Sequence, residues 1–297
     1  MNPEVNEAFR SGFVAIAGRP NTGKSTFMNR VLGERLSITS PKPQTTRYAV
    51  KGILNTPTQQ IIFVDTPGFL KPRYEMQERM LKIFSDALRD VDLLLFFTDI
   101  KDFPTQYDLQ VLEHFSTLSC HQIAVFNKLD ESPDVDRAAL METLPASIEE
   151  SHFVSSLTGE NIPPLMEAIT RYIPFHEPFY DQEQLSDLPM RFFATEVIRE
   201  AIFHLYEQEI PYSTAVIIEA YREHPDEVIV EAQIWVEKGS QKVIIIGKRG
   251  EGLRKIREYS NQRLQEFLGM PVRVHLWVKV IPNWRKKRIN LRELGFV

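Results

Sequence analysis

The chain of 297 residues is longer than most domains with a single core, and its 43% hydrophobic and 25% charged content is typical of a folded, two-domain protein. Cys120 is the only cysteine, which excludes a disulfide framework or a cysteine metal cluster and favours a reducing cytosol. The longest apolar runs are too short to cross a bilayer, so we expect a soluble protein.

Charge is unevenly distributed along the chain, whose formal net charge is −5. From Lys238 to Arg288, 14 Lys and Arg stand against three Glu, a local net charge of +11 that leaves −16 for the remainder. Such a basic segment predicts either a polyanion-binding site or an ordinary solvated surface.

Short β-rich runs alternate with helical patterns through the first 170 residues. The predicted strands are FVAIA (13–17), YAVKGIL (48–54), QIIFVD (60–65), DLLLFFTD (92–99), HQIAVFN (121–127) and SHFVS (151–155). This alternation predicts an α/β fold with a mostly parallel sheet, covered by helices on both faces and carrying its ligand loops at the strand C-termini.

The segment YIPFHEPFYDQEQLSDLPM, residues 172–190, breaks this pattern with three prolines, aromatic residues and acids. It predicts a first domain over 1–173, a linker over 174–190 and a second domain over 191–297. In the second domain we expect helices at 191–206 and 251–269, a strand pair at 214–221 and 227–237, and a final strand at 271–280, which together make an α+β module.

The most specific motif is a P-loop, Gly18-x-x-x-x-Gly23-Lys24-Ser25, which lies between the first predicted strand and a helix. In such a loop the backbone N–H groups hold phosphates, the lysine neutralises β and γ oxygens, and the serine hydroxyl binds Mg²⁺. The predicted nucleotide contacts here are Gly18, Asn21, Thr22, Gly23, Lys24, Ser25 and Thr26.

Two further motifs follow predicted strands. DTPG begins at Asp65, which puts a carboxylate beside the metal and the Gly68 amide where a γ-phosphate ends; alone, this motif is equally typical of an ordinary turn. NKLD supplies the choice of base, because the Asp130 carboxylate can accept hydrogen bonds from N1–H and N2–H₂ of guanine, whereas adenine lacks both donors. Asn127 is expected to tie this loop to the P-loop, and the Lys128 stem to lie over the base.

A last short motif, Ser155-Ser156-Leu157, follows the strand at 151–155, and we expect its Ser156 amide to donate to guanine O6. The order GxxxxGKS, TT, DTPG, NKLD and SSL resembles the translation-factor-like GTPases over residues 13–173. The resemblance implies that Thr46 in PQTTRY completes the Mg²⁺ shell with Ser25 and Asp65, with Thr45 as the alternative. It also implies GTP hydrolysis to GDP and phosphate, with Lys24, Thr46 and Gly68 as the catalytic contacts.

One position departs from many signalling GTPases, because Phe69 stands where they carry a water-orienting glutamine. A phenylalanine cannot orient water by hydrogen bonding, so we expect slow intrinsic hydrolysis or another catalytic element. Asn21 resembles the asparagine that coordinates K⁺ beside the phosphates in some members of this superfamily. Its alternative role is a hydrogen bond that shapes the loop.

A second glycine loop lies in the basic segment, where VIIIGKRGEGLRKI (243–256) reads as a β-branched run, which by itself favours a strand, a glycine-rich break with two cations and a charged helical pattern. Its GKRG sequence, in a helix–strand–strand–helix–helix–strand order, resembles a type II KH domain over about residues 191–281. KH domains clamp about four single-stranded nucleotides with this loop. The predicted RNA contacts are Gly247, Lys248, Arg249, Gly250, Arg254 and Lys255.

Together the two regions resemble the Era family of bacterial GTPases, whose C-terminal tail is also similar to WRKKRINLRELGFV (284–297). The resemblance implies a monomeric cytoplasmic factor that binds the 3′ end of small-subunit ribosomal RNA, not DNA, and assists small-subunit assembly. The alternative is an RNA-binding or membrane-associated scaffold, peripheral to the inner face of the cell membrane, with GTP as a regulatory ligand. A P-loop kinase is a third hypothesis that does not explain NKLD.

Overall fold

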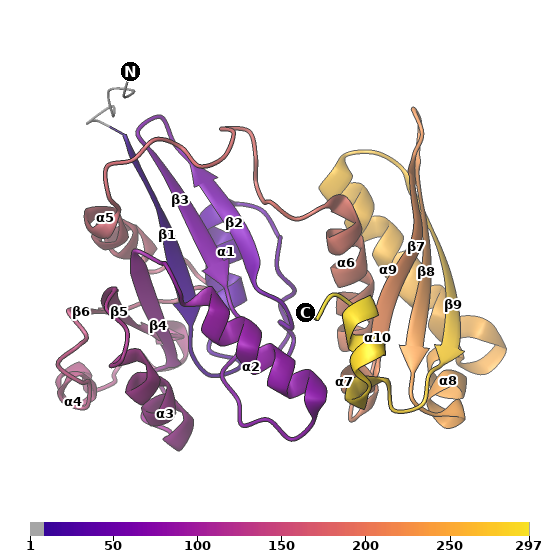
Figure 1. Cartoon of the computed structure of the whole chain (residues 1–297), viewed down its shortest axis with the longest axis horizontal. Helices are drawn as coiled ribbons and strands as arrows, with labels where there is room; N and C mark the ends of the chain where they lie inside the picture. The colour runs from indigo at the N-terminus through magenta and orange to yellow at the C-terminus, as the bar shows by residue number, and fades with distance from the viewer. Residues whose placement is uncertain (1–8, 297) are drawn as a thin grey trace. The chain divides into compact units, whose positions relative to one another are not determined.

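The computed structural model describes residues 9–296, so the outermost ends of the two predicted domains, 1–8 and 297, lie outside it. The chain divides into two compact units (Figure 1). The first unit includes the chain up to Ser37, Thr46–Lys71 and Met80–Asp187, and the second includes Ile38–Thr45, Pro72–Arg79 and the chain from Leu188. The exact domain borders of the sequence analysis stay predictions.

Residues 9–173 build a six-stranded sheet flanked by helices. Its elements are β1 (Arg10–Ala17), α1 (Lys24–Leu32), β2 (Val50–Asn55), β3 (Gln59–Asp65), α2 (Glu75–Ala87), β4 (Leu93–Asp99), α3 (Gln106–Phe115), β5 (His121–Asn127), a 3₁₀ turn (Leu129–Glu131), α4 (Arg137–Glu142), β6 (Glu150–Phe153) and α5 (Ile162–Tyr172). The strand order is β2-β3-β1-β4-β5-β6, and only the β2–β3 pair is antiparallel. The predicted mostly parallel α/β sheet is confirmed.

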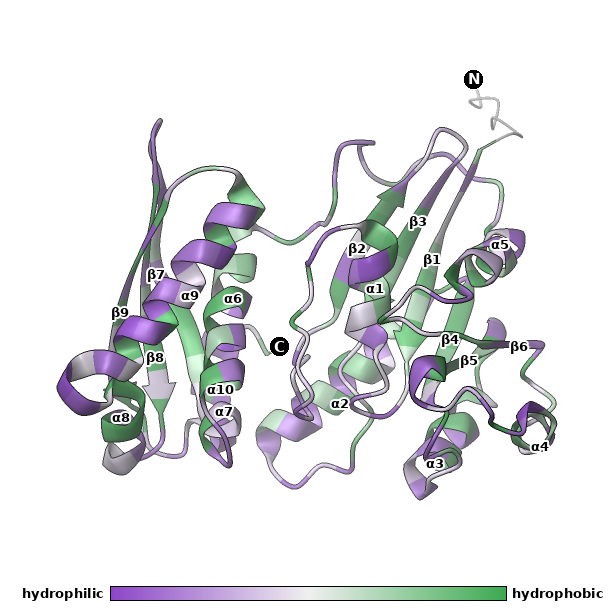
Figure 2. Cartoon of the chain, turned by 180° about the vertical axis from the view of Figure 1, so that it is seen from behind, coloured by the Kyte–Doolittle hydropathy of each residue, from purple (hydrophilic) through white to green (hydrophobic). Residues whose placement is uncertain are grey.

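The central strand β4, LLLFFTD, is buried at every residue, because helices cover both faces of a parallel sheet. Apolar residues run along β1, β3 and β4 in Figure 2. The parallel register aligns the polar ends of neighbouring strands, pairing Ile16 with Asp65 and Asp99 with Asn127. Two motif residues, Asp65 and Asn127, therefore lie at the same edge of the sheet.

The segment predicted as a linker runs along the β2–β3 edge of the first unit. Its Leu185 carbonyl accepts from Ile53 N at 2.8 Å, and the buried Gln60 side chain donates to Tyr180 O at 2.8 Å. An ion pair joins Lys51 to Asp187 at 2.7 Å. Up to Asp187, this segment is therefore held by hydrogen bonds.

The second unit carries a three-stranded sheet under two long helices. Its elements beyond residue 188 are α6 (Met190–Leu205), α7 (Ile210–Ser213), β7 (Ala215–Glu223), β8 (Val228–Val236), α8 (Gly239–Ile246), a 3₁₀ turn (Lys248–Gly250), α9 (Glu251–Leu268), β9 (Val272–Val280), a 3₁₀ turn (Trp284–Lys286) and α10 (Arg288–Glu293). The strand order is β7-β8-β9, with β7 antiparallel and β9 parallel to β8. Figure 2 shows polar residues along α9, whose apolar positions Ile256 and Leu264 join the core with Ile198 of α6.

The β-branched run Val243–Ile246 is not a strand but the end of helix α8, the helix that the predicted KH order places before the loop. Gln241 and Ile245, one turn apart, are buried, whereas Val243 is 70% exposed, which is a helical rather than an alternating pattern. Gln241 Oε1 also accepts from the backbone N–H groups of Glu237 and Lys238, at 2.9 and 3.0 Å, and so caps the helix start. Tertiary packing and capping here override the β propensity of a short apolar run.

Among residues 9–296, no helix combines the length and the apolar character needed to cross a membrane.

Candidate functional site

The P-loop connects the end of β1 to the first residues of α1. Gly23 has φ 92°, a backbone conformation that favours glycine, and a Cβ there would lie 2.1 Å from Asn127 Nδ2. A Cβ at Gly68 would lie 2.7 Å from Pro20, so the DTPG motif packs directly against the P-loop. The buried Thr22 closes the turn through its hydroxyl, which donates to Arg19 O at 3.2 Å.

Lys24 lies inside this loop and is 5% exposed. Its Nζ donates to Arg19 O at 2.8 Å and to Gly18 O at 3.4 Å, and these bonds hold the ammonium group within the loop. Burial lowers the pKa of Lys24 to about 8, and the nearby Asp65 carboxylate opposes that shift. A phosphate arriving in the loop would stabilise the charged form.

Three oxygen-bearing side chains meet at the predicted metal position. Ser25 Oγ donates to Asp65 Oδ2 at 2.6 Å and lies 3.1 Å from Thr46 Oγ1. Asp65 is fully buried, and burial raises its pKa, while Lys24 and Ser25 act in the opposite direction. The second carboxylate oxygen of Asp65 is buried without a hydrogen-bond partner among the described residues. Two hydroxyls and an unsatisfied carboxylate oxygen form a donor set that fits Mg²⁺.

The adjacent threonine, Thr45, was the alternative switch residue. Its hydroxyl donates to Lys42 O at 2.7 Å, whereas the Thr46 hydroxyl lies beside Ser25. This arrangement supports Thr46 as the metal-facing residue.

Asn127 joins the P-loop to the two loops predicted to bind the base. Its Nδ2 donates to Thr22 O at 2.7 Å, as the sequence predicted, and its Oδ1 accepts from Ser156 N at 2.8 Å. Asp130, in the 3₁₀ turn, is exposed, and Lys128 Nζ pairs with Asp99 Oδ2 at 2.6 Å. The carboxylate predicted to select the base is thus accessible, on a loop that Asn127 holds in place.

The SSL loop is held by internal hydrogen bonds, and its contact with guanine O6 stays a prediction. The Ser156 amide, expected to donate to guanine O6, donates in this structure to Asn127. Ser155 is buried and its Oγ accepts from Thr158 N at 3.0 Å, while Leu157 is 69% exposed. The sequence motif identified the loop, but the direction of each amide depends on hydrogen bonds between distant residues.

Phe69, after the DTPG motif, is partly buried with its ring centroid 5.5 Å from that of Phe84. Its backbone N–H donates to Gly18 O at 3.0 Å. The side chain therefore packs against the core and carries no group that can orient water.

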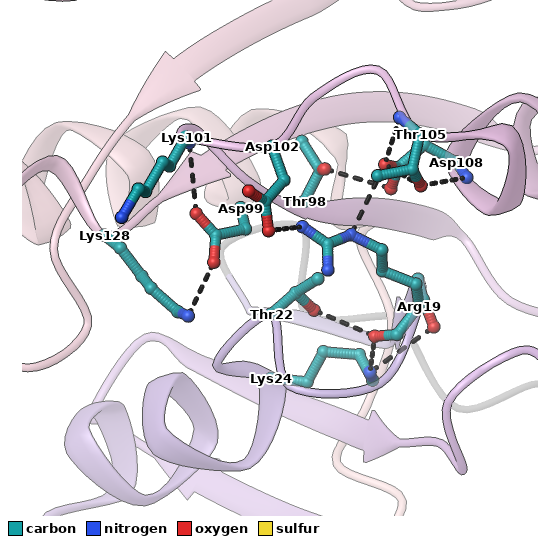
Figure 3. A network of polar contacts seen from close by, with 11 residues as sticks. Arg19, Thr22, Lys24, Thr98, Asp99, Lys101, Asp102, Thr105, Asp108 and Lys128 are labelled. Carbon is teal, nitrogen blue, oxygen red and sulfur yellow. Dashed lines mark hydrogen bonds and ion pairs between the residues drawn. The ribbon is translucent and has the colours of Figure 1, made fainter. Parts of the chain in front are cut away.

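A polar network behind the P-loop was not predicted from the sequence. Figure 3 shows the Arg19 guanidinium between Asp102 and Asp108, at 3.4 and 3.3 Å, although Arg19 belongs to the phosphate-binding loop. Asp108 is completely buried and also accepts from Thr98 and Thr105. The one local signal was TQYD (105–108), a capping-box pattern that places Asp108 at the start of α3.

The candidate RNA loop connects α8 to α9. Gly247 has φ 70°, and a Cβ there would lie 2.8 Å from Gly252 N, so the backbone turns too tightly for a side chain. Lys248 and Arg249 are exposed between Gly247 and Gly250, which turns into α9 with φ 80°. The loop therefore presents two cations on closely folded backbone, which suits a sugar-phosphate chain.

The two predicted RNA contacts on α9 are exposed but paired along the helix, with Arg254 3.8 Å from Glu258 and Lys255 3.4 Å from Glu251. Such exposed ion pairs contribute little to the stability of the fold. Both cations therefore stay available to phosphate. A residue that the sequence did not flag is Gly252, where a Cβ would lie 2.5 Å from Ile245 O. Its missing side chain lets α8 and α9 approach at the loop.

The fold and these loops define a P-loop GTPase domain followed by a KH domain, and comparisons with known proteins agree. The family model for the 50S ribosome-binding GTPase matches residues 13–128, and the model for the KH domain matches 209–285. The chain is 40% identical over 291 residues to the GTPase Era of Clostridium botulinum (strain Loch Maree / Type A3), covering 97% of this chain and 98% of that protein. It is 41% identical to the GTPase Era of Thermotoga petrophila, with the same shares covered.

Two solved structures resemble the whole chain. One is Era in complex with MgGDPNP and nucleotides 1506–1542 of 16S ribosomal RNA, with a TM-score of 0.94 and 35% identity, covering 97% of this chain and 99% of that one. The other is an Aquifex aeolicus Era variant bound to GDP and AlF₄⁻, with the same TM-score and identity, covering 97% and 100%. The chain belongs to the Era family of GTPases.

Proposed function

We propose that this protein is a GTP-hydrolysing switch that binds small-subunit ribosomal RNA near its 3′ end and assists assembly of the small ribosomal subunit. The observation that carries the proposal is the convergence of Ser25, Thr46 and the unsatisfied Asp65 carboxylate beside a P-loop, in a chain that also presents GKRG on a KH fold. The Era complex with 16S ribosomal RNA supports the choice of RNA.

In the proposed mechanism the P-loop amides hold the phosphates and Lys24 neutralises the oxygens around the transferred group. Ser25, Thr46 and Asp65 would hold Mg²⁺, which supplies positive charge against the phosphate oxygens. Thr46 lies on a loop, so its contact with the metal would order that loop in the GTP state and release it after hydrolysis.

Phe69 leaves the hydrolysis step without a side chain that orients water, so we infer that a monovalent cation assists. Asn21 lies exposed in the P-loop with φ 65°, and we propose that it helps to hold K⁺ beside the phosphates. Potassium would supply the charge that an arginine finger provides in other GTPases.

The RNA-binding step is assigned to Lys248, Arg249 and the start of α9. The exposed apolar side chains of Val243 and Ile244 flank the loop, at 70% and 48% exposure, and would support bases while the cations meet the backbone. Peripheral attachment to the inner face of the cell membrane stays a prediction.

Phe69 also favours the second candidate function, a scaffold that binds RNA and uses GTP only as a ligand. The test is single-turnover GTP hydrolysis with and without an RNA oligonucleotide matching the small-subunit 3′ end, in KCl and in NaCl. The switch proposal predicts faster hydrolysis with RNA or K⁺. A rate no higher than that of Lys24→Ala under all four conditions would favour the scaffold.

A further inference from the structure

Ser37 lies in the buried first part of the loop that joins α1 to β2. Its neighbours Leu36 and Ile38 are buried, as is Ser37 itself. Asn29 of α1 holds the backbone of this serine, because its side chain donates to Ser37 O at 2.8 Å and accepts from Ser37 N at 2.9 Å. These two bonds fix the Ser37 main chain against the helix that begins at the P-loop. No sequence motif assigned a role to either residue.

The side chain of Ser37, in contrast to its backbone, is not satisfied. Its hydroxyl is buried and has no hydrogen-bond partner among residues 9–296. Such a group costs stability, since it gives up its hydrogen bonds to water when the chain folds. One reason to retain a buried, unpaired hydroxyl is a ligand that only the loaded protein contains.

The hydroxyl of Ser37 lies near a second unpaired oxygen. Burial raises the pKa of Asp65, and the Ser37 hydroxyl is one of the groups that lower it, after Lys24 and Ser25. A hydroxyl has this effect only at short range, so it lies close to the carboxylate. Asp65 Oδ2 accepts from Ser25, whereas Asp65 Oδ1 is buried without a partner in the described part of the chain. A further side-chain oxygen therefore borders the predicted metal position.

We propose that the Ser37 hydroxyl belongs to the metal site and acts there through water. Mg²⁺ keeps several of its water molecules when a protein binds it, and each of these can donate two hydrogen bonds. Asp65 Oδ1 and Ser37 Oγ are two buried, unpaired acceptors that one such water can satisfy together. The inference rests on the proposed Mg²⁺-dependent nucleotide site and adds a residue to it.

The contact made by Ser37 should not depend on the γ-phosphate. Its anchor, Asn29, belongs to α1, and the two bonds between these residues involve no atom of the switch threonine Thr46. Thr46 is proposed to leave the metal after hydrolysis, whereas Ser37 stays in place. Ser37 should therefore support the metal with GDP as well as with GTP.

The test measures how much Mg²⁺ the full chain needs to retain a nucleotide. Fluorescent GDP and a fluorescent non-hydrolysable GTP analogue are displaced by excess unlabelled nucleotide at graded free Mg²⁺, which gives the Mg²⁺ concentration for half-maximal retention. Ser37→Ala should raise this concentration about tenfold for both nucleotides, because groups that contact a metal through its ligands typically contribute about 10- to 100-fold to metal affinity. In EDTA the parent and the variant should release nucleotide at the same rate.

Ser11→Ala is the matched control. Ser11 is also fully buried with a hydroxyl that is unpaired within residues 9–296, but it lies near the start of β1, whose other end leads into the P-loop. This variant should keep the Mg²⁺ requirement of the parent. Neither variant should melt below the parent when free of nucleotide, because each removes a buried hydroxyl that makes no hydrogen bond.

A purely structural role for Ser37 would speed nucleotide release by the same factor in EDTA and in Mg²⁺, and that result would overturn the inference. A shift confined to the GTP analogue would also overturn it, since it would assign the effect to the switch loop.

The proposed metal site fails in a different way from the role of Ser37. If Mg²⁺ does not slow nucleotide release from the parent, the site formed by Ser25, Thr46 and Asp65 is wrong. If Mg²⁺ slows release equally from the parent and from Ser37→Ala, the metal site stands and the role of Ser37 is wrong.

Discussion

Asp130 is exposed on a turn that Asn127 anchors, and its carboxylate can accept from both N1–H and N2–H₂ of guanine. In Asp130→Asn an amide N–H can instead donate to a carbonyl at C2. We therefore expect GTP to weaken by about 10²-fold while xanthosine triphosphate gains affinity. Calorimetry of both nucleotides against parent and variant checks this, and an unchanged GTP/XTP ratio would remove Asp130 from the base site.

The proposed role of Asn21 in holding K⁺ can be tested by removing its side chain. Its backbone has φ 65°, so glycine can replace it without strain, and Asn21→Gly removes only the side-chain amide. Because the proposed K⁺ replaces a missing cationic group, the parent should hydrolyse GTP on the order of tenfold faster in KCl than in NaCl at equal ionic strength. The glycine variant should lose most of that difference.

The control for the potassium test is GTP affinity, which should be similar for the parent and Asn21→Gly if the amide acts on the transition state. Equal rates of the parent in the two salts would reject the ion site. The alternative role, a hydrogen bond that shapes the loop, predicts instead that the variant loses activity equally in both salts.

Residues that belong to compact motifs could be predicted from the sequence, because a motif fixes both the residue types and the spacing that the chemistry needs. Ser25 donates to Asp65, Lys24 lies inside the P-loop, and Asn127 donates to the P-loop carbonyl of Thr22. The partner of the Ser156 amide could not be predicted, since it depends on a side chain 29 residues away. The role of Arg19 was missed for the same physical reason, because its partners Asp102 and Asp108 are remote in sequence.

Among the helices and strands, the long periodic helices and the buried strands agree with the sequence prediction. The short apolar run at 243–246, whose residue types favour a strand, does not. Val243–Ile246 has β-branched residues but forms the last turn of α8, because Gln241 caps its start and Ile245 packs in the core. The loop after it keeps its proposed role, since the glycines and cations stand between two helices in the predicted order.

The GKRG loop, residues 247–250, is predicted to bind RNA, and charge reversal tests this. Replacing Lys248 and Arg249 with Asp reverses two exposed charges and leaves both glycines in place, so the fold should persist. Binding of a single-stranded 3′-end oligonucleotide should fall, and the slope of log affinity against log salt should drop by about 1.4, since each phosphate contact contributes roughly 0.7. GTP affinity should stay at the parent value.

The matched control reverses two exposed cations, Lys82 on α2 and Arg89 in the turn after it, and so changes the net charge equally. It should bind the oligonucleotide as the parent does. If the GKRG variant is folded by circular dichroism yet keeps the parent affinity and salt slope, the loop is only a turn and the basic surface has another use.

For the whole molecule, the order of motifs predicted a parallel-sheet GTPase followed by a KH domain, and both are present. What the sequence did not predict is how the chain is divided between compact units. The segments Ile38–Thr45, which ends at the first threonine of the TT motif, and Pro72–Arg79, which follows DTPG, are grouped with the second unit. Such grouping follows from tertiary packing, which local periodicity does not encode.

The central claim is that the nucleotide state controls RNA binding. Its most direct test is the anisotropy of a labelled small-subunit 3′-end oligonucleotide, titrated with the protein in Mg²⁺ and either a non-hydrolysable GTP analogue or GDP. A coupling free energy of about 1–3 kcal/mol between nucleotide and RNA binding corresponds to a change in RNA affinity of about 5- to 150-fold. The account predicts tighter RNA binding with the GTP analogue, and equal affinity in the two nucleotide states would contradict it.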